Sequence, residues 1–574
     1  MTSTVDRIPA VRAGTPAVPQ PVSGRWRRLP WAVLAASLLA FGLGAPSITT
    51  AAGSYFGLLA TASPLYGASI LLAAFGFAVA MRQRNTAAGV SAIVVVIICQ
   101  RLPRALFTEA PMYAWTYKHL GVVDYIQQNH ALARGVDIYN GWPGLFATTA
   151  WFSDLTGVPA IDIAHWFTPV AHVALAGLAY AAARAWRLSP DQALTATFLV
   201  VSLNWVEQDY FAPQALAMIL VLGVIMLLGL ALDRPADVTP LLILFAAITI
   251  THQLTPAWVL LAVVLLVIGR KTTPWWITLP MALMFLGVFL ANHDITQHYT
   301  LFSSDVVSNA KTQFPPVATG VVGQLFTSAV MRMLSMLLWL SAAIVLVWRW
   351  GRREPVWALG VLALSPVLIL GGQGYGGEAV FRVFLYSLPG CAFVLAPPLL
   401  SALRGRRTRW VATCVTVVVL TAMSAQAYFG SWFTNLISRS QIHAADAVLA
   451  GGDYPAYVTP LVPVWPERGT AGYVKYAQYS PKYDHSLMFQ EGLIGVDFDT
   501  EAEYQRFLTV MGWRTDASTY LVLSEPMSMY AGYFGLFPPD ALANLREHVE
   551  KDPRWQPVET GTDVWVYLHR VTKE

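Results

Sequence analysis

The sequence predicts a polytopic α-helical membrane protein of about thirteen transmembrane helices, followed by a C-terminal extracytoplasmic α/β domain. Composition is the first observation behind this fold class. Of the 574 residues, 56% are hydrophobic and 12% charged, with a mean hydropathy of +0.51, whereas a soluble domain carries about 25% charged residues. The second is that apolar runs recur up to residue 428, and the third is that residues 429–574 return to ordinary polarity.

Residues 1–28 are predicted to form a disordered cytoplasmic tail, because Pro, Ala, Thr and Val dominate them with little periodicity. An apolar run follows Arg25–Arg28, as in a signal peptide, but no cleavage site is obvious and further apolar runs follow. We therefore expect a retained signal anchor.

The transmembrane domain is predicted over residues 29–428, with a long outer loop at 101–161. A helix perpendicular to the membrane needs about 20 residues, and several of the apolar runs are shorter than that. The candidate spans are 31–49, 58–81, 86–100, 162–183, 192–206, 213–231, 237–251, 255–268, 275–291, 322–347, 355–371, 382–400 and 409–428.

The gaps between these spans sort by charge. Arginine or lysine occupies every gap on the side of the N-terminus, and the positive-inside rule makes that side cytoplasmic. The N-terminus is then cytoplasmic and the C-terminus extracytoplasmic, in the cytoplasmic (inner) membrane. Arg101 and Arg104, on the outer side, are the exception. The cytoplasmic positions are Arg25, Arg27, Arg28, Arg82, Arg84, Arg184, Arg187, Arg234, Arg270, Lys271, Arg349, Arg352, Arg353, Arg404, Arg406, Arg407 and Arg409.

The polar tail, 429–574, is predicted to be an α/β domain. Residues 519–524 and 562–570 have the alternation of strands, and 539–551 begins acidic and ends basic, as a helix does.

Several functions are disfavoured. The net charge of +4 is small and lies mainly in short loops, which indicates orientation in the bilayer and argues against nucleic-acid binding. No Walker A sequence or dinucleotide fingerprint occurs, so an ATP-driven pump is not expected. No carboxylate lies in mid-span, as a proton-coupled transporter would require. Cys99, Cys391 and Cys414 all fall in apolar runs and predict neither a disulfide framework nor a thiolate metal site.

The first outer loop carries candidate site residues. Glu109 lies just after the third span, and the aromatic residues that follow it are typical of a helix at the membrane interface. Such a helix can hold a carboxylate near a lipid headgroup, and the alternative is a surface helix with solvated charges. The candidates in this loop are Glu109, Lys118, His119 and Asp124.

The second outer loop is short and contains Glu207 and Asp209 two residues apart. Hard divalent cations such as Mg²⁺ prefer oxygen ligands, so the pair is a candidate site for Mg or Mn, or for a cationic ligand. The alternative is a solvated turn before the next helix, with Pro213 in its first turn.

Three further candidates lie at other outer ends. His252, at the end of the seventh span, can bind phosphate or relay a proton, and the alternative is a helix-end histidine bonded to a backbone carbonyl. Glu378 and Arg382 are four residues apart and can pair on one helix face. An arginine in the membrane is costly and is by default functional. Its planar fork suits phosphate, and the alternative is a structural pair between helices.

This order of features resembles the GT-C superfamily of integral-membrane glycosyltransferases, which use polyprenyl-phosphate sugars outside the cytoplasmic membrane. The resemblance covers most of the chain as architecture. Glu109 matches the early carboxylate of the first loop, although Glu stands where Asp is usual, and Glu207 and Asp209 match an acidic motif of the second loop. The strand patterns at 520–524 and 563–568 resemble the end domain of actinobacterial-type envelope glycosyltransferases.

The resemblance implies a hexosyl- or pentosyltransferase that moves a sugar from a polyprenyl-phosphate donor to a cell-envelope glycan or glycolipid, among membrane lipids. Glu109 would be the general base, with Asp124 as the other first-loop candidate and Asp209 assisting the acceptor or a metal. Arg382, with Lys118, His119 or His252, would neutralise the departing phosphate. A polysaccharide polymerase or ligase of the O-antigen type, and a lipid-linked-glycan transporter, are the alternatives.

Overall fold

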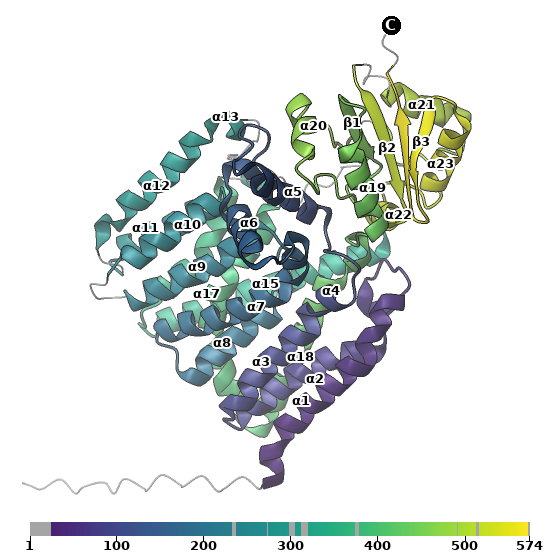
Figure 1. Ribbon diagram of the computed structural model, residues 1–574. Helices are drawn as coiled ribbons and strands as arrows, with labels where there is room; N and C mark the ends of the chain where they lie inside the picture. The colour runs from purple at the N-terminus through teal and green to yellow at the C-terminus, as the bar shows by residue number, and fades with distance from the viewer. Residues whose placement is uncertain are drawn as a thin grey trace, which may run out of the picture.

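A computed structural model describes residues 24–231, 237–271, 274–297, 305–310, 320–372, 378–490, 492–511 and 516–571. Most of the predicted tail, residues 1–23, and the loop charge at Arg234 lie outside these ranges. The described chain forms a bundle of helices with an α/β region on one end, shown in yellow-green at the upper right of Figure 1. We call this the domain-bearing end of the bundle.

Within the described ranges, seven helices are long and apolar enough to cross a membrane, so the chain is a multi-pass membrane protein. They are α1 (Gly24–Gly44), which continues into η1 (Ala45–Thr50), α2 (Pro64–Arg82), α7 (Ala160–Ala185), α9 (Pro213–Leu230), α15 (Val322–Gly351), α17 (Ala379–Leu403) and α18 (Arg407–Phe429).

Shorter helices fill the remaining predicted spans. They are α3 (Thr86–Arg101), α8 (Pro190–Ser202), α10 (Thr239–Thr251), α11 (Thr255–Ile268), α12 (Thr278–Ala291) and α16 (Trp357–Leu364), which η5 (Ser365–Gly371) extends. A helix therefore occupies each of the thirteen predicted segments, and seven have the length to cross the membrane unaided. The predicted fold class, a polytopic helical protein with a C-terminal sheet, is confirmed.

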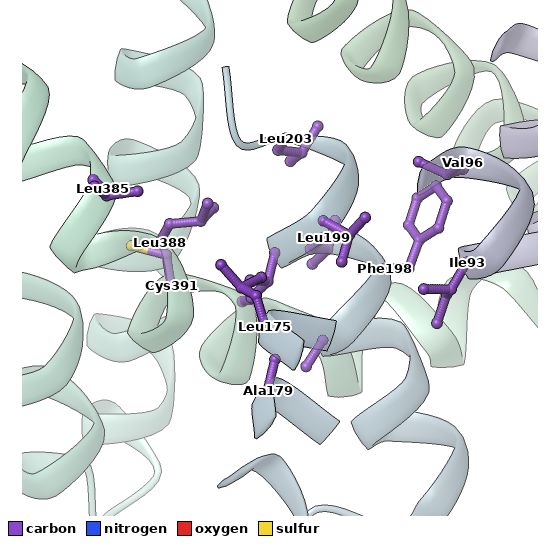
Figure 2. Close-up of a cluster of buried hydrophobic side chains, with 14 of the residues drawn as sticks. Ile93, Val96, Leu175, Ala179, Phe198, Leu199, Leu203, Leu385, Leu388 and Cys391 are labelled. Carbon is purple, nitrogen blue, oxygen red and sulfur yellow. The ribbon is translucent and has the colours of Figure 1, made fainter. Parts of the chain in front are cut away.

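The core of the bundle surrounds α8, which is buried along almost its whole length. Figure 2 shows Phe198 of α8 pointing toward Ile93 and Val96 of α3, with Leu199 on the side of α7 and α17. Phe198 also stacks on Phe77 of α2, with ring centroids 4.0 Å apart. This central position fixes where α8 ends, and therefore where the loop after it lies.

The long loop after α3 is itself helical. It contains α4 (Pro103–Leu106), α5 (Ala114–Asn129), η3 (Tyr139–Gly141) and α6 (Gly144–Thr156). Trp151 and Leu155 of α6 are more than 60% exposed, as expected for a helix that lies against lipid. Helix α5 lies at the domain-bearing end close to the α/β region, while α6 packs on α7 and α10 of the bundle (Figure 1).

The α/β region holds a four-stranded sheet in the order β1-β2-β4-β3. Strand β1 (Ala456–Pro460) is parallel to β2 (Ser518–Ser524), while β4 (Val564–His569) is antiparallel to β2 and to β3 (Trp555–Thr560). The helices are α19 (Arg439–Ala450), α20 (Tyr473–Tyr479), α21 (Glu501–Met511), α22 (Glu525–Phe534) and α23 (Ala541–Lys551). The predicted strands at 519–524 and 562–570 and the predicted helix at 539–551 are confirmed as β2, β4 and α23.

Candidate functional site

The loop between α8 and α9 places Asp209 in a buried cluster of cations. Its Oδ1 accepts a hydrogen bond from Arg104 Nη1 at 2.5 Å, and Arg101 Nη1 lies 3.3 Å from Oδ2. The Nε2 of His172 lies 2.8 Å from Oδ2, and the Tyr428 hydroxyl donates to Oδ2 at 3.0 Å. The ends of α3 and α18 and the middle of α7 thus meet on one carboxylate.

The neighbouring guanidinium charges keep the Asp209 carboxylate ionised. Burial alone would raise the pKa of Asp209, but the guanidiniums of Arg104 and Arg101 outweigh burial and hold the pKa well below its usual range. Asp209 is therefore ionised, and its two oxygens are already occupied by donors. The same pairing explains the exception to the charge rule, because Arg101 and Arg104 lie on this side to meet Asp209.

The predicted metal pair does not fit a divalent cation. Two guanidiniums lie within 3.3 Å of Asp209, so a cation bound there would face like charge at close range. In the described ranges no group of three His, Cys, Asp or Glu side chains could hold a metal ion.

Glu207 is the half-buried carboxylate of the same loop. The Tyr113 hydroxyl donates to Oε2 at 2.7 Å and the Ser431 hydroxyl donates to Oε1 at 2.5 Å. Burial raises the pKa of Glu207, and the opposing charge of Arg104 is the smaller effect. A raised pKa makes a carboxylate a stronger proton acceptor, and one that stays partly open to solvent can take a proton from a ligand.

A second polar group extends the site toward α17. Gln208 Nε2 donates to Glu378 Oε2 at 2.7 Å, and Arg382 Nη2 donates to the same oxygen at 3.0 Å. Arg382 is buried, while 47% of the Glu378 side chain is exposed. The predicted Glu378–Arg382 pairing is thus present, and Gln208 joins it to the loop that carries Glu207.

His252 lies at the end of α10, where its Nδ1 accepts hydrogen bonds from the backbone N–H groups of Leu254 and Thr255 at 3.3 and 3.2 Å. The Thr255 hydroxyl contacts the same nitrogen at 3.0 Å and the Tyr386 hydroxyl at 2.7 Å. These contacts are those of a helix-end histidine, with backbone N–H groups in place of the expected carbonyl.

The first-loop candidates lie in other surroundings. Glu109 is exposed, and its carboxylate accepts a hydrogen bond from the Arg439 backbone N–H at 3.4 Å. His119 is buried with Nδ1 2.7 Å from the Phe211 carbonyl, and burial lowers its pKa to about 4, so the ring is neutral at pH 7. Asp124 accepts a hydrogen bond from the Ala471 N–H at 2.7 Å. The structure does not bring these three side chains onto Glu207.

Lys118 belongs to a charged network that joins α5 to the α/β region. Its ammonium lies 2.6 Å from Glu467 and 3.6 Å from Asp484. Arg468 donates to Asp484 at 2.6 Å and lies 3.5 Å from Asp137, which follows α5. All five side chains are nearly buried, so this contact fixes the position of the α/β region over the first loop.

Several residues of the site were not identified as candidates from the sequence. Tyr113 and Ser431 look like ordinary loop residues, and His172 lies in the middle of an apolar run. Arg101 and Arg104 gave the one sequence signal for this site, because they are the exception to the positive-inside pattern of the loops. Their partner is 105 positions away from Arg104 in the sequence, so no local pattern could have named it.

A small cavity of about 20 Å³ adjoins the cluster, lined by His172, Asn204, Gln208 and Asp209 together with apolar side chains of α7, α9 and α17. This space holds about one water. His172 Nδ1 and Asn204 Oδ1 are buried without a hydrogen-bond partner in the part of the chain that the structure describes.

Comparison with family models and with curated proteins finds no match. Among solved structures, the chain is similar to the Archaeoglobus fulgidus oligosaccharyltransferase tethered with an acceptor peptide, with TM-score 0.46 and 12% identity over 88% of this chain and 74% of that chain. Another structure of that oligosaccharyltransferase is a complex with Zn and sulfate.

Two further similar structures are ArnT from Cupriavidus metallidurans bound to undecaprenyl phosphate (TM-score 0.45, 10% identity, 84% of this chain and 97% of that chain) and the arabinofuranosyltransferase AftD from Mycobacteria (TM-score 0.44, 13% identity, 85% and 40%). Each TM-score is below 0.5, and each identity is 13% or less.

Proposed function

We propose that this protein is a membrane glycosyltransferase that moves a sugar from a polyprenyl-phosphate donor to a cell-envelope glycan or glycolipid, with Glu207 as general base. The observation that carries the proposal is Glu207 itself. It is a half-buried carboxylate with a raised pKa, held by two hydroxyl donors beside a cluster of arginines.

The position of this carboxylate supports the proposal. Its loop lies at the domain-bearing end of the bundle, where the ends of α3, α8, α17 and α18 converge beneath the first loop. The charge sorting of the loops predicts that this end faces away from the cytoplasm. A lipid-linked donor in the membrane and a hydrophilic acceptor outside it would meet at such a junction.

The chemistry requires one proton transfer and one departing anion. The acceptor hydroxyl oxygen forms a bond to the anomeric carbon of the sugar while the bond from that carbon to the phosphate oxygen breaks. The electron pair leaves with the polyprenyl phosphate, and Glu207 takes the hydroxyl proton. Arg382, which Glu378 and Gln208 join to the loop of Glu207, is the cation that we assign to the phosphate.

Asp209 is a poor choice for the base because the guanidiniums of Arg104 and Arg101 outweigh its burial and hold its pKa well below the usual range, which makes it a weak proton acceptor. Glu109, the candidate that the family resemblance implied, is exposed and lies beside Arg439. Glu109 is the alternative base, and Asp124 is the other first-loop candidate.

The test is a sugar-transfer assay with purified full-length protein in lipid nanodiscs, using radiolabelled polyprenyl-phosphate pentoses and hexoses as donors. Glu207→Gln should lower kcat by about 10²–10⁴-fold, the usual contribution of a general base, with KM little changed. Glu109→Gln and Asp124→Asn are the comparison variants. If Glu207→Gln keeps full activity while Glu109→Gln loses it, the base is assigned wrongly.

Activity that survives loss of all three carboxylates but not of Arg382 would favour a polymerase or ligase of the O-antigen type, which needs no carboxylate base. Transport of a lipid-linked glycan across proteoliposomes, without transfer of sugar to any acceptor, would favour the transporter.

A further inference from the structure

We infer that Arg104 and Tyr113 are positioning residues that hold the Glu207 carboxylate, with Asp209 as the fixed anchor of the arrangement. The inference deepens the proposed function and rests on it for its catalytic meaning. The claim that the Tyr113 hydroxyl stabilises the ionised form of Glu207 can be tested without any sugar transfer.

The geometry is an unbroken line of hydrogen bonds. Arg104 uses both ends of its guanidinium, Nη1 to Asp209 Oδ1 at 2.5 Å and Nη2 to the Tyr113 hydroxyl oxygen at 2.6 Å. The same hydroxyl then donates its hydrogen to Glu207 Oε2 at 2.7 Å. A hydroxyl that accepts from a cation is polarised and becomes a stronger donor, so Arg104 strengthens the hold of Tyr113 on Glu207.

The arrangement orients Glu207 as well as binding it. Tyr113 donates to Oε2 while Ser431, from the segment after α18, donates to Oε1 at 2.5 Å. Each oxygen thus has one donor from a different part of the chain, which fixes the carboxylate plane. An ionised carboxylate offers about four lone-pair positions, so positions remain for the proton of a ligand.

Tyr113 is itself held firmly. Its ring stacks on Tyr210 with centroids 4.7 Å apart, and its backbone N–H donates to the Asn435 carbonyl at 2.9 Å. Its φ of +70° lies in the left-handed region, which is uncommon for a residue other than glycine and costs about 1–3 kcal/mol. A strained conformation persists only where the surroundings impose it, as at a residue placed for function.

The line does not conduct protons. An arginine cannot be deprotonated in a protein, so a proton cannot pass from Glu207 through Tyr113 to Asp209. The role of Arg104 and Asp209 is therefore electrostatic and geometric. Asp209 keeps Arg104 in place, Arg104 directs the Tyr113 hydroxyl, and that hydroxyl stabilises the ionised form of Glu207.

The experiment compares Tyr113→Phe with Tyr117→Phe in the full-length protein. Tyr117 is a matched control because it is a buried tyrosine one turn further along, whose hydroxyl donates to the Pro111 carbonyl at 3.0 Å. Infrared difference spectra against pH record the carboxyl band of Glu207, which is identified by its disappearance in Glu207→Gln. Tyr113→Phe should move the titration of that band upward by about one pH unit, and Tyr117→Phe should leave it in place.

Ser431→Ala provides a second variant, since it removes the other donor from a partly exposed position and should also move the band upward. Where transfer is measurable, the acidic limb of the kcat profile should move with the band while KM stays constant. If the Glu207 band moves in neither Tyr113→Phe nor Ser431→Ala, the inference is overturned, whatever the transfer activity of these variants. A band that moves while Glu207→Gln remains fully active supports the positioning and overturns the proposed function instead.

Discussion

Replacing Asp209 by Asn should destabilise the whole bundle, because this carboxylate neutralises two buried arginines. Arg101 is completely buried and Arg104 nearly so, and their guanidinium nitrogens lie 3.3 and 2.5 Å from the carboxylate oxygens. Asparagine keeps the volume, so no cavity forms. It also turns an N–H₂ group toward donors, since His172 and Tyr428 point at Oδ2.

The expected loss is about 3–5 kcal/mol of unfolding free energy, the usual cost of leaving a buried charge without its partner. The low pKa of Asp209 determines the pH range over which this loss of stability is expected. A carboxyl whose pKa is lowered on folding contributes stability above its unfolded pKa of about 3.9, and that stability is lost as the pH falls through the folded value. Between about pH 5 and 9 the difference between wild type and Asp209→Asn should therefore be constant.

The assay is equilibrium unfolding of the protein in bicelles by steric trapping, with Asp154→Asn as control. Asp154 is an acidic residue of the first loop that accepts an exposed hydrogen bond from Gln127 at 2.6 Å, and its substitution should change stability by less than about 0.5 kcal/mol. A loss below about 1 kcal/mol for Asp209→Asn would refute the reasoning. So would Mn²⁺ binding by calorimetry that wild type shows and Asp209→Asn lacks, since that would make Asp209 a metal ligand.

Three predictions concern the contact between α5 and the α/β region. Lys118→Met should leave Glu467 and Asp484 as buried acids facing each other, and limited proteolysis between the bundle and the α/β region should become faster. Gly121→Ala should lower the melting temperature sharply, because the added Cβ would lie 1.8 Å from the Arg468 carbonyl oxygen, and backbone cannot give way as a side chain can. Burial and the neighbouring Asp484 charge raise the pKa of Glu467, so its neutral form is the stabilising one and stability should fall as the pH rises above the usual glutamate range. Glu467→Gln should flatten that pH dependence of the melting temperature.

The helices were predictable because apolar runs are long and loop charges sort by side, but their ends were less so. The run predicted at 192–206 ends as a helix at Ser202, although Leu203, Trp205 and Val206 are apolar and buried. Apolar composition indicates that a segment is buried, but it does not indicate that the segment is helical. A buried loop in the core of a bundle is as apolar as a helix. Strands β1 and β3 were missed because each contains a proline and is short.

For the candidate site, the sequence indicated the loop but not the arrangement of its side chains. The Glu-x-Asp loop does lie at a junction of helices, yet the sequence treats Glu207 and Asp209 alike. Their difference arises because residues two apart in an irregular loop point into different surroundings, one toward Arg101 and Arg104 and the other toward hydroxyls. Such partners come from distant segments, which only the tertiary fold brings together.

The network around Lys118 has a consequence for how the chain can be divided. A fragment that begins after α18 would retain Glu467, Arg468 and Asp484 but lose Lys118 and Asp137, their partners in the first loop. These three charged side chains and the apolar side chains around them would then be exposed to water. Chimaeras that exchange the α/β region between related proteins should therefore exchange residues 114–141 together with it.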